Sequence, residues 1–194
     1  MTHAAATHRT SMGVDSRKIA FWAFIGSECL LFGSLISTYL IYKGRSVVGP
    51  YPHDILNIPF TSVSTFDLLM SSLMMVLALA AVQRGDLKWA KVWLAATALL
   101  GILFLCGQVY EFTSFVHEGL TLQTNLFGAT FFVLTGTHGA HVTVGVVWLL
   151  TLWVRTLQGK LTTANALTVE ICGLYWHFVD VVWIVIFTVV YLIQ

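Results

Sequence analysis

Near its end the chain reads Tyr175-Trp176-His177-Phe178-Val179-Asp180-Val181-Val182-Trp183, and this run shows the class of the whole protein. A histidine and an aspartate stand in the middle of a stretch that is otherwise apolar enough to cross a bilayer. Charged side chains are costly at the centre of a lipid-embedded helix, so they usually face a protein interior or a water-filled cavity and mark function. The run therefore predicts a transmembrane helix with a functional polar face.

The composition of the rest of the chain agrees with a membrane protein. Of its 194 residues 57% are hydrophobic and 10% are charged, and the mean hydropathy is +0.82. Soluble domains average about 25% charged residues. A formal net charge of +1 without a Lys/Arg-rich run gives no support to nucleic-acid binding. The odd cysteine count without CxxC spacing argues against disulfides and zinc, and we expect Cys29, Cys106 and Cys172 to be small buried residues.

Apolar segments long enough to span a membrane recur along the chain. A hydrocarbon core about 30 Å thick needs about 20 apolar residues in a helix. Five segments qualify, at about Ile19–Tyr42, Thr65–Val82, Trp89–Phe115, Leu126–Trp153 and Leu167–Ile193. Backbone groups must be satisfied internally in lipid, so each segment is expected to be a helix. The prediction is an all-α, polytopic bundle of five transmembrane helices over residues 19–194, after a polar cytoplasmic segment, residues 1–18.

The distribution of basic residues predicts the orientation. Cytoplasmic loops of membrane proteins carry an excess of Lys and Arg. Eight of the ten basic residues lie on the side of the N-terminus: Arg9, Arg17, Lys18, Arg84, Lys88, Lys91, Arg155 and Lys160. The opposite side carries Lys43 and Arg45. The N-terminus is therefore expected in the cytoplasm and the C-terminus outside.

Five ionisable residues are expected at similar depth. With a rise of about 1.5 Å per residue, Glu28 lies about 14 Å into the first helix, near the midplane. On the same scale His138 and His141 reach the cytoplasmic half of the fourth helix, and His177 and Asp180 lie in the middle of the fifth. Each of these two pairs has the spacing of residues on one helix face. We expect the five side chains to pair inside the bundle or at a cleft, as proton-linked groups or as contacts to lipid or another subunit.

A structural alternative stands beside this interpretation. A transmembrane histidine, or a His177–Asp180 pair, often serves only to hydrogen-bond a neighbouring helix. Glu28 is the stronger functional candidate, because its sequence neighbours are small and no cation lies nearby in sequence. Glu111 and Glu170 are expected nearer to helix ends, where they would orient those ends.

Redox chemistry within this chain is not expected. His177 with His138 or His141 could in principle hold a haem between two helices, but His138 and His141 sit close together in crowded aromatic surroundings. No metal-ligand spacing and no nucleophile–base arrangement is present in the sequence. The prediction is therefore a chain without catalytic residues, metal or cofactor.

Four motifs in order resemble one family. Phe24–Phe32 is similar to "FIxSExxxF", Gln108–Phe112 to "QxxEY", and Gly128–Val142 to "GSTFFxxTGFHGxHV". The run Tyr175–Trp183 contains "WHFVDVVW". On these motifs the chain is identified as a member of the haem-copper respiratory oxidase subunit III family. It resembles the short form, found in quinol oxidases and several cytochrome c oxidases, because the first two spans of the long form are missing. Asp67 stands where long-form members carry an apolar residue, and no role is assigned to it.

This resemblance implies a function and partners. It implies a non-catalytic subunit of a proton-pumping terminal oxidase in the bacterial plasma membrane, stabilising the catalytic subunit and bound phospholipid and supporting proton uptake. Haem and copper would belong to subunits I and II. Subunit I would be the direct partner, with subunit II and a small subunit IV in the same complex. Glu28 matches the family's carbodiimide-reactive carboxylate. Cytochrome c is favoured over quinol as electron donor, a choice that subunits I and II set.

Three other interpretations remain open from the sequence. One is an accessory, subunit III-like protein of a nitric oxide reductase system. Another is a proton-coupled transporter that uses the same acids and histidines, although such folds need a discontinuous helix or an internal repeat. The third is a di-haem membrane cytochrome.

Overall fold

The structure is a computed structural model that describes residues 15–47 and 49–193 of the chain. Most of the polar segment predicted over residues 1–18 lies outside this part. The helices are α1 (Ser16–Tyr42), α2 (Pro52–Ile55), α3 (Ile58–Gln83), α4 (Leu87–His117), α5 (Leu126–Leu157) and α6 (Ala166–Phe187). A 3₁₀ turn, η1 (Thr163–Asn165), precedes α6, and a π-helical turn, η2 (Thr188–Leu192), follows it.

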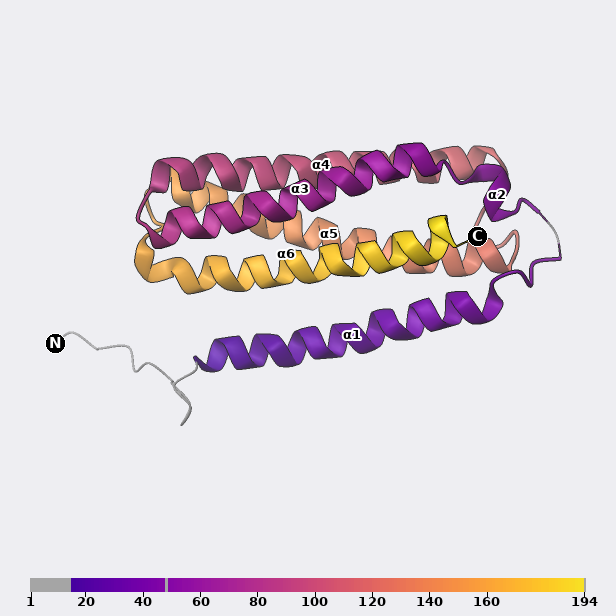
Figure 1. Cartoon of the computed structure of the whole chain (residues 1–194), viewed down its shortest axis with the longest axis horizontal. Helices are drawn as coiled ribbons and strands as arrows, with labels where there is room; N and C mark the ends of the chain where they lie inside the picture. The colour runs from indigo at the N-terminus through magenta and orange to yellow at the C-terminus, as the bar shows by residue number, and fades with distance from the viewer. Residues whose placement is uncertain (1–14, 48, 194) are drawn as a thin grey trace.

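The five long helices confirm the predicted fold class. Five helices are long and apolar enough to cross a membrane, and the described residues are helices and connections. These helices run side by side along the long axis of the molecule (Figure 1). Helices α3 to α6 form the bundle, and α1 lies along its side against α5 and α6.

The second span starts earlier than the sequence analysis predicted. Helix α3 begins at Ile58 instead of Thr65, since Pro59 does not interrupt it. Proline is tolerated in the first turn of a helix, where its missing N–H would have no partner anyway. The side chain of Asn57 caps this turn by accepting a hydrogen bond from the Phe60 N–H at 3.1 Å.

Trp176 on α6 joins all four helices of the bundle. Its indole is buried and lies directly against Gly101 of α4 and Gly145 of α5. Its Nε1–H donates a hydrogen bond to the Ser71 hydroxyl of α3 at 2.9 Å. The glycines matter here, because a larger residue at either position would occupy the volume of the indole.

Trp183 repeats this arrangement two helical turns further along α6. Its Nε1–H donates to the Thr65 hydroxyl of α3 at 3.0 Å. Its ring packs edge-on against Phe104 of α4, with 4.8 Å between centroids, and stacks on His138 of α5 at 4.9 Å. The signature run of the sequence thus forms the centre of the core.

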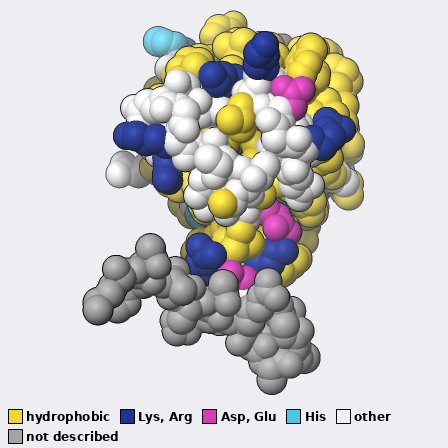
Figure 2. Space-filling model, turned by 90° about the vertical axis from the view of Figure 1, so that its left-hand side faces the viewer, with side chains coloured by type: hydrophobic (Ala, Val, Ile, Leu, Met, Phe, Trp, Pro, Cys, Tyr) yellow, Lys and Arg dark blue, Asp and Glu magenta, His cyan; other side chains and the backbone are white. Residues whose placement is uncertain are grey.

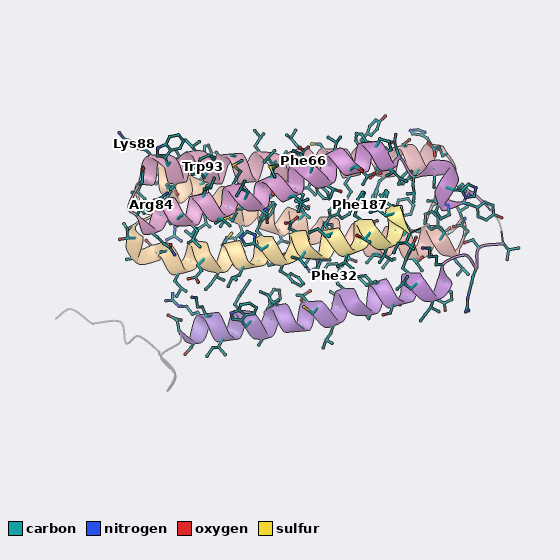
Figure 3. All side chains as sticks on the ribbon, in the orientation of Figure 1. Phe32, Phe66, Arg84, Lys88, Trp93 and Phe187 are labelled. Carbon is teal, nitrogen blue, oxygen red and sulfur yellow. The ribbon has the colours of Figure 1, made fainter. Side chains whose placement is uncertain are left out.

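Helix α1 is held to the bundle along one stripe and at both ends. Its buried residues are Ile25, Phe32 and Tyr39, and Phe32 lies between α1 and α6 in Figure 3. Near one end the Lys18 ammonium pairs with Glu170 of α6, N to O 2.6 Å. At the other end Lys43 donates to the Ile193 carbonyl. Most of the remaining residues of α1 are exposed, so this helix is the peripheral element of the fold.

The prediction that the cysteines are buried is wrong for two of the three. Cys172 is buried in α6, whereas Cys29 of α1 and Cys106 of α4 are exposed. These two positions are on helix faces directed away from the bundle, where an apolar thiol can face lipid at little cost.

Candidate functional site

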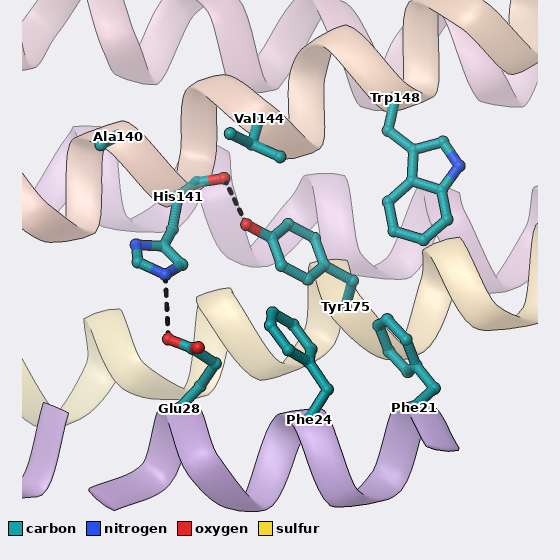
Figure 4. A pocket seen from close by; sticks show the side chains of 8 residues that line it. All are labelled: Phe21, Phe24, Glu28, Ala140, His141, Val144, Trp148 and Tyr175. Atoms are coloured by element: carbon teal, nitrogen blue, oxygen red, sulfur yellow. Dashed lines mark hydrogen bonds and ion pairs between the residues drawn. The ribbon is translucent and has the colours of Figure 1, made fainter. Parts of the chain in front are cut away.

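A groove on the side of the molecule lies between α1, α5 and α6 (Figure 4). Its volume is about 530 Å³. Most of its walls are aromatic or aliphatic, and its lining residues are Phe21, Phe24, Glu28, Ala140, His141, Val144, Trp148 and Tyr175. Two of the five predicted polar residues therefore share one groove, and the other three lie elsewhere.

Glu28 of α1 and His141 of α5 form a direct pair in this groove. The imidazole Nε2 lies 3.1 Å from the carboxylate Oε2, and the two side chains are 19% and 15% exposed. The other ring nitrogen, Nδ1, lies 2.8 Å from the carbonyl oxygen of Thr137. A carbonyl oxygen can only accept, so Nδ1 must carry a hydrogen.

This hydrogen-bond pattern leaves one further proton to be shared by Nε2 and the carboxyl group. If the proton is on Nε2, the pair is an imidazolium and a carboxylate; if it is on Glu28, both groups are neutral. The net charge of the pair is zero in either form. The pair therefore places no net charge in the membrane, where charge is costly.

Aromatic residues fix the position of this pair. The Tyr175 hydroxyl donates to the backbone carbonyl of His141 at 3.0 Å, which links α6 to α5 beside the groove (Figure 4). The ring of Phe32 lies 5.0 Å from the imidazole, centroid to centroid. Phe21 closes the neighbouring wall with an edge contact to Trp148 at 6.1 Å. The imidazole therefore has little freedom to turn away from Glu28.

His138 is separate from His141 despite the spacing on one helix. It is fully buried in the core, where its ring stacks on Trp183 and meets Phe104 edge-on at 5.9 Å. Within the described residues neither of its ring nitrogens has a hydrogen-bond partner. His138 points into the bundle, and His141 points into the groove.

His177 and Asp180 meet α3, not the histidines of α5. The Nδ1 atom of His177 lies 2.7 Å from the Ser72 hydroxyl. The same hydroxyl hydrogen-bonds the buried Asp180 carboxyl group. In the part of the chain that the structure describes, the Oδ1 atom of Asp180 has no partner. Ser72 was not singled out from the sequence, although a serine in an apolar helix at the depth of His177 was the available signal.

Glu111 and Glu170 both tie helix ends together. Glu170 holds the start of α6 to the start of α1 through Lys18. Glu111 is buried; it accepts hydrogen bonds from Thr61 at 2.5 Å and from Tyr191 at 3.3 Å. It thereby connects α4 to the first turn of α3 and to η2. Its burial was not anticipated from the sequence, since the hydroxyl partners lie far along the chain.

The geometry gives no support to the haem and transporter interpretations. His138 stacks on Trp183, His141 pairs with Glu28 of α1, and His177 bonds to Ser72 of α3, so the three histidines have different neighbours. Among residues 15–47 and 49–193, no group of three or more His, Cys, Asp or Glu side chains is placed to hold a metal ion. Each spanning α-helix is continuous over its assigned range, whereas a transporter of this kind would need a broken one.

These features define a multi-pass membrane protein with a glutamate–histidine pair in a lateral groove. Comparison with known proteins then gives the family. The chain matches the family described as cytochrome c oxidase subunit III over residues 3–194, and it belongs to that family.

Individual relatives include both kinds of respiratory oxidase. The chain is 41% identical to cytochrome c oxidase subunit 3 of Bacillus sp. (strain PS3) over 97% of this chain and 91% of the relative. It is also 41% identical to quinol oxidase subunit 3 of Bacillus subtilis (strain 168), over 90% and 85%. Cytochrome bo(3) ubiquinol oxidase subunit 3 of Pseudomonas putida is 38% identical over 90% and 84%. The chain is therefore subunit III of a haem-copper terminal oxidase, and works in a complex with other oxidase subunits.

Proposed function

We propose that this subunit stabilises the catalytic subunit and its lipids and sustains proton uptake, and that the Glu28–His141 pair is its functional element. The supporting observation is a pair that shares one proton at the wall of a groove open to the side of the bundle. Such a pair can buffer or relay a proton at low electrostatic cost.

A phospholipid acyl chain fits the groove. The walls formed by Phe24, Val144 and Trp148 are apolar, and Glu28 lies near the middle of its helix, far from the headgroup region. An acyl chain lying over the pair would exclude water and keep the proton on it. In this proposal the bound lipid keeps the shared proton on the pair, and the Glu28 carboxyl group in turn helps to retain the lipid.

The remaining predicted residues have supporting roles in the proposal. His138, His177 and Asp180 belong to the core that positions α5 and α6. Glu111 and Glu170 hold helix ends in register. None of these residues is assigned a part in catalysis, and haem and copper are assigned to the partner subunits.

We further propose that the N-terminus lies in the cytoplasm of a bacterial cell and the C-terminus outside its plasma membrane. Basic side chains gather at the end of the bundle near the start of α1 (Figure 2). That end carries Arg84 and Lys88, which Figure 3 labels. Residues 1–18 are then a polar cytoplasmic segment, and residues 19–194 form a single membrane domain.

The proposed assembly places the chain directly against subunit I, together with subunit II and a small subunit IV. Cytochrome c is the favoured electron donor. Oxygen consumption by the purified complex tests this choice of donor. Consumption driven by reduced cytochrome c supports the proposal, and consumption driven only by a quinol contradicts it.

The first experiment tests membership of the complex. The tagged chain is purified from native membranes in mild detergent, and a dithionite-reduced minus oxidised visible spectrum is recorded. An a-type or o-type haem signal is expected from the co-purified subunits. A featureless spectrum from an intact preparation would refute the assembly.

The second experiment tests the pair itself through Glu28→Gln. We expect a shorter active lifetime during turnover and less phospholipid per complex, because a glutamine cannot take up or release the shared proton. Ser27→Ala is the matched control, since Ser27 is exposed and, among the described residues, its hydroxyl bonds to the Phe24 carbonyl of its own helix alone. If turnover lifetime, lipid content and subunit association all stay at wild-type values in Glu28→Gln, the carboxyl group has no such role.

A further inference from the structure

Asp67 is unlike the other acidic residues of the spanning helices. Within the part of the chain that the structure describes, it has neither a hydrogen bond nor an ion pair to another side chain. The others each have a partner: Glu28 with His141, Glu111 with Thr61 and Tyr191, Glu170 with Lys18, and Asp180 with Ser72. The chain thus neutralises or hydrogen-bonds every other acid that it places in these helices.

The position of Asp67 makes this lack of a partner costly. It lies about 14 Å along α3 from Ile58, and α3 is about 39 Å long, so Asp67 lies inside a hydrocarbon core about 30 Å thick. Its side chain is half-buried, and its neighbours Val63 and Phe66 are 63% and 58% exposed. The exposure of Val63 and Phe66 shows that this side of α3 faces away from the bundle. Helix α3 itself lies on the part of the molecule far from α1 (Figure 1). A carboxyl group there is expensive unless a donor or a cation meets it.

The neighbouring hydroxyls of α3 do not supply that donor. Ser64 and Ser71 lie one turn before and after Asp67. The Ser64 hydroxyl donates to the Phe60 carbonyl, and the Ser71 hydroxyl donates to the Leu68 carbonyl. Ser71 also accepts the indole N–H of Trp176. The group that satisfies Asp67 must therefore come from outside these residues.

We propose that Asp67 is the docking point for a transmembrane helix of another oxidase subunit, which places a lysine, arginine or histidine side chain against it. The inference rests on the proposed function in that the chain must work inside the complex. The surrounding surface suits a helix contact, since Val63, Phe66 and Tyr110 of α4 are exposed, and Tyr110 packs against Phe60 with 5.4 Å between ring centroids. The attraction between the Asp67 carboxylate and this cationic side chain then fixes how deep the partner helix lies in the membrane.

The depth of Asp67 excludes two other sources of a cation. A phospholipid headgroup lies at the interface, too far along α3 to reach the carboxyl group. A free cation would have to leave water and enter hydrocarbon, at a cost like that of the carboxylate itself. A cationic side chain on a neighbouring helix enters the membrane with its helix and meets the acid there.

The test compares two measurements on Asp67→Leu, Asp67→Asn and Asp67→Glu. One is the retention of this chain when the oxidase is purified through a tag on another subunit and washed with increasing detergent. The other is the unfolding midpoint of the full chain expressed without the other subunits. Leu73→Ala, at another exposed position of α3, is the matched control.

We expect Asp67→Leu and Asp67→Asn to weaken retention by roughly 5- to 30-fold, the range of an interhelical polar contact in a membrane. Asp67→Glu should restore most of it. The unfolding midpoint of the chain alone should be unchanged or higher in Asp67→Leu, because no internal partner is lost.

Three results would overturn the proposal. These are wild-type retention of Asp67→Leu, a lower unfolding midpoint of that variant on its own, and a change only in the oligomeric state of the isolated chain. The last would place a second copy of this chain at Asp67. Failure of the wild-type chain to co-purify with the oxidase would instead refute the proposed function, so the two failures are distinguishable.

Discussion

Replacing Gly145 by alanine should destabilise the bundle through a single clash. A Cβ atom at this position of α5 would lie 2.8 Å from the Cε3 and Cζ3 atoms of Trp176. The indole cannot easily move away, because it is buried, it also touches Gly101, and its N–H is bound to Ser71. Adding a methyl group to a tightly packed core typically costs about 1–3 kcal/mol. We expect the free energy of unfolding to fall by about that amount.

The assay is reversible unfolding in mixed micelles, followed by the loss of helical circular dichroism as a denaturing detergent is added. Gly136→Ala is the matched control on the same helix, since nothing lies within 4 Å of a Cβ at Gly136. Alanine has a higher helix propensity than glycine, so this variant should be neutral or slightly more stable.

A second substitution separates the clash from a change in helix propensity. Trp176→Phe removes the outer ring atoms that a Cβ at Gly145 would meet. In the double variant the cost of Gly145→Ala should therefore be much smaller than in the wild-type background, a coupling that double-mutant cycles detect. Equal stability of Gly145→Ala and Gly136→Ala, or strict additivity with Trp176→Phe, would show that the close packing around the indole does not limit the fold.

Two further substitutions test the polar contacts at the helix ends. Glu111→Leu should lower the free energy of unfolding by about 1–3 kcal/mol, because the buried Tyr191 hydroxyl loses its acceptor and the Thr61 hydroxyl keeps only the Asn57 carbonyl; an unchanged unfolding curve would contradict this. Glu170→Gln should cost less than about 1 kcal/mol, because the ion pair with Lys18 is about a third exposed. That small effect should shrink further as salt is added, and a large, salt-independent loss would be unexpected.

The five-helix fold was predictable because lipid leaves the backbone few choices. Each span must be a helix of membrane-crossing length, so hydropathy alone located all five. The error at the start of α3 had a local cause. Pro59 was interpreted as part of a connector, whereas a proline in the first helical turn is compatible with the helix. The cap at Asn57 was the signal that could have corrected the boundary.

The candidate site was predictable only in part. Residue spacing gives the depth and face of a residue on its own helix, but it does not identify the residue that it contacts on another helix. Glu28 and His141 were expected at similar depth, and the structure pairs them. His138 has nearly the same depth and spacing, yet the small rotation between positions i and i+3 turns it toward Trp183. Whether a histidine enters the groove or the core depends on how α5 is rotated in the bundle. That rotation follows from packing, which one sequence does not display.

The contacts between α3 and α6 show what a sequence could reveal about such rotations. The two helices are antiparallel, and hydroxyl side chains of α3 meet hydrogen-bonding side chains of α6 at successive levels: Thr65 with Trp183, Ser71 with Trp176, and Ser72 with His177. A serine or threonine in an apolar helix is therefore informative when a tryptophan or histidine recurs at matching intervals in another. The same comparison isolates Asp67, which lies on α3 among these residues and has no such match in the described part of α6. A polar residue whose partner is within the chain explains the fold, whereas Asp67, on the outer side of α3 and without such a partner among the described residues, is where we propose that the fold meets another protein.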